Sequence, residues 1–136
     1  MMAPTTTPTL ERTETADDLL RAAHREAYRL GEQELVRYLK GVLGRPLIAH
    51  ITGIADANNV SRWASGRARP DRGVWERLRT VATIHIALSA IVGSTTSAAQ
   101  WLTGTNPNLD LKMPADELRD GHDAAVFAAV RDLVER

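Results

Sequence analysis

The chain has 136 residues, 43% of them hydrophobic and 25% charged, which is enough for one domain or for two small helical subdomains that share a core. The absence of cysteine excludes a disulfide framework and thiolate metal sites, and it favours a reducing, cytoplasmic location. The 17 basic and 17 acidic side chains balance, which argues against a general binder of polyanions.

The charge is unevenly distributed along the chain. Residues 62–79 carry six basic and two acidic side chains, whereas residues 1–36 and residues 110–136 each carry four basic and seven acidic ones. A local cluster of positive charge of this kind supplies the phosphate contacts that anchor a protein on nucleic acid. The acidic ends indicate a role in solubility or a basic protein partner.

The first half of the chain is predicted to be a tail followed by short helices. Residues 1–14 begin with a Met/Pro/Thr-rich stretch, which predicts a disordered tail and lacks the basic and apolar regions of a secretory signal. Thr15 and Asp18 form a predicted capping box, Gly31 ends the helix that follows, and Arg45-Pro46 stops the next one. The helices expected here cover about residues 16–30, 32–42, 47–53 and 58–65.

The last of these helices carries the strongest functional pattern. Val60 and Trp63 share one helical face and are predicted to be buried, while Gly66 suits the left-handed residue that ends a helix. The remaining polar side chains, with the arginines just beyond, are of the types that hydrogen-bond base edges and phosphates. The predicted DNA-binding residues are Asn58, Asn59, Ser61, Arg62, Ser65, Arg67 and Arg69.

The V-S-R-W sequence of residues 60–63, with Gly66 and Pro70 at their spacing, resembles the recognition helix of the Xre-type helix-turn-helix repressors. In that family a glycine usually opens the turn six residues before the position of Val60, and a small alanine lies four residues earlier. Here Gly53 and Ala49 lie one residue too early, so either the turn has one extra residue or His50 packs where alanine is usual. The other interpretation is an ordinary helical hairpin with a surface cluster of arginines.

A long apolar helix is predicted over residues 73–95. No charged side chain occurs between Thr80 and Leu109, but residues 93–97 interrupt the stretch before it reaches the roughly 20 residues of a membrane span. A helix that is apolar over most of its circumference is expected to be buried on more than one face. In a chain this small, the second buried face predicts a homodimer interface. His85 within it is predicted to be a hydrogen-bonded core histidine, not a metal ligand or a catalyst.

Residues 96–136 are predicted to hold small helices around a turn. Trp101-Leu102, Asn106-Pro107 and Leu109 precede a short helix that Pro114 begins and Gly121 ends. The order W-L-x-x-x-N-P-x-L followed by P-x-D-x-L-x-x-G resembles the C-terminal domain of the Xre/MbcA/ParS antitoxin family.

Members of that family are antitoxins of bacterial type II toxin–antitoxin modules. The resemblance implies a cognate toxin, of the RES type that consumes NAD, which is bound and blocked by the C-terminal domain. It also implies a homodimer that represses its own operon through the helix-turn-helix, and a Trp101 that supports the toxin-binding surface from inside. The toxin-binding residues that it implies are Asn106, Pro107, Leu109, Leu111, Pro114, Asp116, Arg119 and Arg136.

The sequence therefore predicts an all-α chain with a tail over residues 1–14, a DNA-binding domain over 15–72, a linking and dimerisation helix over 73–95 and a toxin-binding domain over 96–136. The alternative is a stand-alone Xre-type repressor whose C-terminal domain serves dimerisation or effector binding. An enzyme is not expected, because the sequence lacks a cysteine nucleophile, a phosphate-binding glycine loop and a metal-ligand cluster, and no cofactor is implied. His122-Asp123 could suggest a base with its orienting carboxylate, but such neighbours more often cap a helix.

Overall fold

The computed structural model describes residues 15–135, and over that range the chain is helical, with one isolated bridge between Asn106 and Lys112. The all-α prediction is therefore confirmed. The elements in chain order are α2 (Ala16–Arg29), α3 (Glu32–Leu43), α4 (Arg45–Thr52), α5 (Asn58–Ser65), α6 (Arg72–Val92), α7 (Thr95–Thr103), the 3-10 turn η2 (Pro107–Leu109), α8 (Pro114–Arg119) and α9 (Asp123–Glu135).

The helix boundaries follow from local capping chemistry. The predicted capping box is present, since the Thr15 hydroxyl accepts from the Asp18 amide at 3.0 Å and the Thr15 amide donates to the Asp18 carboxylate at 3.3 Å. The expected start of α4 near residue 47 is wrong by two residues. Gly44 alone makes the break, with φ of 85°, and Pro46 lies in the first turn of α4, where its missing N–H costs no hydrogen bond.

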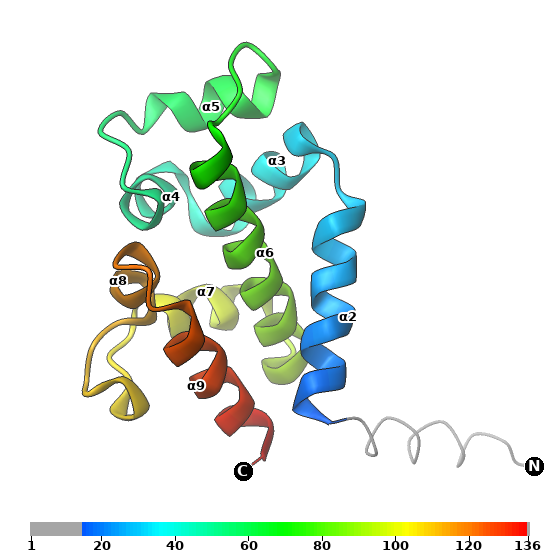
Figure 1. Ribbon diagram of the computed structural model, residues 1–136, viewed down its shortest axis with the longest axis vertical. Helices are drawn as coiled ribbons and strands as arrows, with labels where there is room; N and C mark the ends of the chain where they lie inside the picture. Colours follow the sequence, from blue (N-terminus) through cyan, green and yellow to red (C-terminus); the bar gives the residue numbers. More distant parts are fainter. Residues whose placement is uncertain (1–14, 136) are drawn as a thin grey trace, which may run out of the picture.

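Helix α6 runs through the middle of the molecule, with α2, α7 and α9 packed along it and α3, α4 and α5 gathered near its first turns (Figure 1). Its apolar side chains from Leu78 to Leu88 are almost fully buried, except for the partly buried Ile86. Burial of this size removes water from most of the helix surface, so α6 contributes much of the hydrophobic stabilisation of the fold.

The same packing bears on two of the sequence predictions. The apolar circumference of α6 suggested a homodimer, but helices of the same chain cover its buried stretch, so α6 no longer argues for a second copy and the dimer stays a prediction. Buried residues of the three predicted segments, 15–72, 73–95 and 96–136, belong to one hydrophobic cluster. Their division into functional segments also stays a prediction.

His85 lies inside this core, fully buried, and the prediction of a hydrogen-bonded core histidine is confirmed. Its Nε2 lies 3.1 Å from the carbonyl oxygen of Thr95, to which it donates, and its Nδ1 is paired with the hydroxyl of Tyr38. Burial lowers the pKa of His85 below its ordinary value of 6.5 and raises the pKa of Tyr38 to about 12. Both groups are thus held neutral, and together they tie α3 to α6 and α6 to the start of α7.

This pair predicts a pH dependence of stability. Because the pKa of His85 is lower in the folded chain than in the unfolded chain, protonation favours unfolding. The stabilising contribution is present above the ordinary pKa of 6.5 and is lost as the pH falls through the lowered one. We expect the free energy of unfolding, from urea titrations at about pH 7.5 and about pH 5.5, to fall more in the wild type than in His85→Gln. Equal falls in the two proteins would contradict this assignment.

Candidate functional site

Helices α4 and α5 form the unit that the sequence suggests as a DNA reader. Gly53 ends α4 in the left-handed conformation, with φ of 77°, and its amide donates to the carbonyl of Ala49 at 2.9 Å. Ala49 is buried and His50 is half-buried. The small Ala49 therefore packs inward, and residues 53–57 separate α4 from α5. The helix-turn-helix assignment, and with it the choice between the two alternatives for the turn, stays a prediction.

The inner face of α5 is fixed in the core. Val60 and Trp63 are buried as predicted, Trp63 with 6% of its surface exposed, and Arg37 of α3 donates to the carbonyl of Ala64 at 3.1 Å. Gly66 ends the helix with φ of 80°, and a β-carbon there would lie 2.5 Å from the Gln33 amide nitrogen. A residue other than glycine would be strained in this backbone conformation and would have to displace the flexible end of the Gln33 side chain, so glycine is favoured where α5 ends.

The outer face of α5 and the segment after it carry the seven residues predicted to bind DNA, and all of them are exposed or half-exposed. Several already contact a polar neighbour. Arg62 donates to the Asn59 side chain at 2.8 Å, and Arg69 pairs with Glu32 at 3.2 Å. A phosphate that binds Arg69 would therefore have to compete with Glu32 for its guanidinium. The Arg62 and Asn59 side chains, in contrast, are held next to each other on the surface of α5 by their own hydrogen bond.

Sequence reasoning missed one basic residue of this surface. Arg45, at the first position of α4, donates to the Asn58 side chain at 3.2 Å. Its place beside the first residue of α5 adds a cation to the predicted reader. The sequence did contain a signal for this role, because a basic residue at the start of one helix of a tight helical pair lies close to the other helix. Arg45-Pro46 was instead interpreted only as the stop of the preceding helix.

The predicted toxin-binding stretch begins with a closed loop. The Asn106 amide donates to the Lys112 carbonyl at 3.0 Å, and the Leu111 amide donates to the Asn106 carbonyl at 2.9 Å. The Asn106 side chain also accepts from the Asn108 amide at 2.9 Å. Residues 106–112 are therefore held by their own hydrogen bonds in one conformation.

Burial divides the residues predicted to bind the toxin into two groups. Asn106, Leu109 and Pro114 are buried, so they shape the loop and offer no free side-chain surface to a partner. The predicted residues that face outward are Pro107, Leu111 and Arg119, together with half-exposed Asp116, whereas Arg136 lies outside the described residues. Trp101 is half-buried and, with Pro107, lines a hollow of about 250 Å³ beside the loop.

His50 joins the two candidate surfaces. Its Nε2 lies 2.6 Å from a carboxylate oxygen of Asp116, and its Nδ1 lies 2.9 Å from the guanidinium of Arg119. Because a guanidinium can only donate, Nδ1 is the acceptor and Nε2 carries the proton donated to Asp116. Arg77 of α6 adds a second tie by donating to the carbonyls of Leu118 and Arg119. Helix α8 is thus bound to α4 of the predicted DNA reader and to the central helix.

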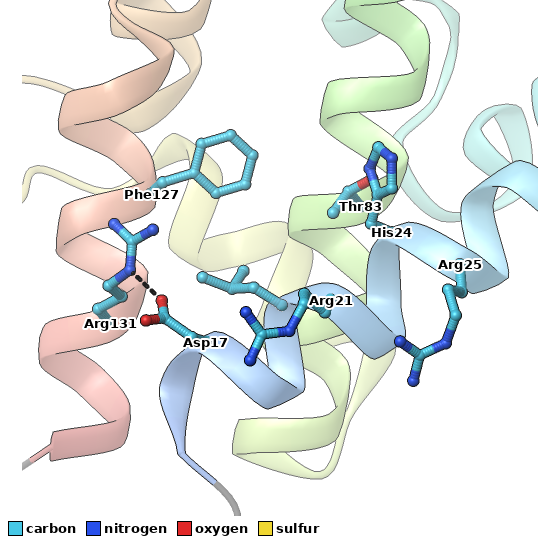
Figure 2. A pocket seen from close by; sticks show the side chains of 8 residues that line it. Asp17, Arg21, His24, Arg25, Thr83, Phe127 and Arg131 are labelled. Atoms are coloured by element: carbon cyan, nitrogen blue, oxygen red, sulfur yellow. Dashed lines mark hydrogen bonds and ion pairs between the residues drawn. The ribbon is translucent and has the colours of Figure 1, made fainter.

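A groove on another face was not indicated by any sequence motif. It has a volume of about 450 Å³ and lies between α2, α6 and α9, with Leu20 and Phe127 on its walls and arginines on its rim. Figure 2 shows the ion pair between Asp17 and Arg131, 2.8 Å apart, which joins α2 to α9 beside the groove. The groove could not be read from the sequence because its walls come from opposite ends of the chain.

Two further features concern cofactors and membranes. Glu117, Asp120 and His122 have ligand-type atoms within 4.8 Å of one another, but two of them are exposed and surface groups of this kind are common without a metal. Within residues 15–135, no single helix is long and apolar enough to cross a membrane; α6 and α7 satisfy the test only together, and the chain bends by 119° between them.

The His50 contact can be tested through stability. In a double-mutant cycle of His50→Ala and Asp116→Ala, we expect a coupling free energy of about 0.5–1 kcal/mol, reduced by the partial exposure of the pair. The matched control is the exposed pair Arg72 and Glu76 within α6, for which we expect roughly 0.3 kcal/mol. Urea unfolding measures both cycles. Coupling at His50 no larger than in the control would mean that the contact does not hold α8 to α4.

Comparison with known proteins gives one informative similarity. No family model and no solved structure matches the chain. Among curated proteins, it is 28% identical over 110 residues to the mycobacterial cidal antitoxin MbcA of Mycobacterium tuberculosis, strains H37Rv and CDC 1551, and to that of Mycobacterium bovis. The alignment covers 78% of this chain and 96% of the relative. This similarity supports the antitoxin family whose C-terminal motifs the sequence resembles.

Proposed function

We propose that this chain is the antitoxin of a bacterial type II toxin–antitoxin module. The observation that carries the proposal is the similarity to mycobacterial antitoxins, which extends over nearly the whole length of those relatives. In this function the chain acts by binding and not by turnover. It binds a cognate toxin, of the RES type that consumes NAD, and represses its own operon in the bacterial cytoplasm.

The α5 surface supports the DNA-binding part of the proposal. Asparagine can bond adenine bidentately and arginine can bond guanine, and Asn58, Asn59 and Arg62 present these groups on the outer face of α5. Arg45 and Arg67 add cations at the two ends of the helix, where phosphate contacts give affinity without sequence choice. A homodimer would place two such helices on successive turns of the duplex.

The loop and helix α8 support the toxin-binding part. Pro107, Leu111 and Arg119 are exposed, and α8 and the segment before it lie apart from α5 (Figure 1). A toxin on this surface would leave the outer face of α5 free. The proposal therefore allows the chain to hold operator DNA and toxin at the same time.

For DNA binding, the sharpest test is Arg62→Ala. We expect operator affinity, measured by fluorescence anisotropy with the DNA upstream of the operon, to fall about tenfold or more, because one bidentate base contact contributes about 1–3 kcal/mol. The melting temperature should change little, since Arg62 is exposed. Trp63→Ala is the opposite control. Removal of a buried aromatic side chain costs about 3–5 kcal/mol, so this variant should show a lowered melting temperature and lose operator binding through unfolding. A large loss of stability in Arg62→Ala would assign that side chain to the fold.

To test toxin binding, the chain is co-expressed with the product of the neighbouring gene. The host cells are ones whose growth stops when the neighbouring gene is expressed alone. We expect growth to be restored and the two proteins to copurify in fixed stoichiometry, while the isolated chain leaves NAD unchanged. If the chain binds only operator DNA and a second copy of itself, it is a stand-alone repressor. Turnover of NAD by the isolated chain would contradict a role by binding alone.

A further inference from the structure

The loop between α7 and α8 contains an unusual backbone conformation. Asp110 and Leu111 have φ of 55° and 64°, and they are the non-glycine residues of the described chain with positive φ. A short polar side chain such as that of aspartate tolerates the left-handed region, because it can hydrogen-bond locally. Leucine gains no such compensation, so its β-carbon is placed against the backbone at a cost in stability.

The loop itself requires this backbone but not this side chain. The amide of Leu111 donates to the Asn106 carbonyl at 2.9 Å, and the amide of Lys112 donates to the Leu109 carbonyl at 3.0 Å. These bonds close the turn and force the left-handed conformation at its tip. Glycine adopts that conformation without strain, so the fold of the free chain would be served better by glycine at residue 111.

The Leu111 side chain also contributes little to the core. It is 66% exposed, more than the other exposed large hydrophobic side chains of the described chain, Tyr28 at 55% and Val92 at 41%. Its neighbour Leu109 supplies the apolar contact of the loop, with 5% of its surface exposed. An apolar side chain that strains the backbone and remains mostly in solvent contributes little to the stability of the free chain.

We propose that Leu111 is the anchor through which this chain binds its toxin, inserting into an apolar pocket of that protein. The inference deepens the proposed function and rests on it. The tip is pre-organised by its own hydrogen bonds, so little conformational freedom is lost when the side chain is buried in a complex. A few side chains that are fully buried at the centre of an interface carry most of its affinity, and the solvent-accessible rim around them contributes less.

The surroundings of Leu111 favour a protein partner over nucleic acid. Its neighbours Asp110 and Lys112 are exposed and have opposite charges, which is the polar rim expected around an apolar contact. They give no local excess of positive charge for phosphates. The loop also lies away from α5, where the positive charge is concentrated (Figure 1).

The test uses the unusual backbone to separate binding from stability. In the full chain, Leu111→Gly should keep or raise the melting temperature, by up to about 4 °C, because relief of the left-handed strain offsets the extra freedom of the unfolded chain. The same variant should bind the toxin at least about tenfold more weakly. Calorimetric titration with the purified product of the neighbouring gene measures the affinity, and a thermal scan measures the stability.

Asp110→Gly is the matched control, since it makes the same backbone change one residue earlier and keeps the leucine. We expect Asp110→Gly, which removes one charge of the rim, to weaken toxin binding by no more than about twofold. Leu111→Met, which retains an apolar side chain of similar volume, should bind the toxin with close to wild-type affinity. Operator binding should be unchanged in all three variants.

Three outcomes would overturn the anchor. Leu111→Gly could retain full toxin affinity, Asp110→Gly could lose as much affinity as Leu111→Gly, or Leu111→Gly could dissociate a homodimer while leaving toxin binding intact. The second would show that the loop conformation matters instead of the side chain, and the third that Leu111 binds a second copy. A wild-type chain that does not bind the neighbouring gene product would refute the proposed function, and the anchor with it.

Discussion

The burial of α6 is the constraint on which the rest of the structure depends. A 21-residue helix with little charge in its second half cannot remain exposed, and helices from both ends of the sequence pack against it. Close packing of these side chains favours one register of the helices. The two hydrogen bonds of His85 add a directional constraint to that packing, because only one register pairs its ring with both Tyr38 and the Thr95 carbonyl. A neutral histidine in the core thus helps to position α3 and α7.

This central helix brings two candidate binding surfaces onto one small core, and His50 and Arg77 connect them. His50 belongs to α4, which positions α5, and it contacts the two polar residues of α8 that a partner would meet, Asp116 and Arg119. A partner that pairs with either residue competes directly with His50. If the proposed function holds, a toxin that breaks these contacts would release α8 from α4, which gives a physical route by which toxin binding could change the affinity for DNA.

Much of this architecture could be predicted from the sequence, because the helix ends and buried faces depend on residue patterns within a few positions. The capping box at Thr15, the helix ends at Gly31 and Gly66 and the buried pair Val60 and Trp63 each follow from spacing within a few residues. The misplaced start of α4 shows the limit of such rules, since proline both stops one helix and begins the next. The contacts of His50 lie 66 and 69 residues away in the chain, and no local pattern encodes them. The burial of Asn106 and Pro114 was missed for the same reason.

The residues proposed to bind DNA or toxin differ from the core residues in how far the fold explains them. Trp63 and His85 are accounted for by what they touch in the free chain, so changes there act through stability. Arg62 and Leu111 are accounted for by nothing in the core: one is a surface guanidinium on a short helix and the other an exposed leucine on a strained turn. At Leu111 the backbone favours glycine, so selection for stability alone would not keep leucine there. This departure is the physical reason to seek the role of Leu111 in what the chain binds.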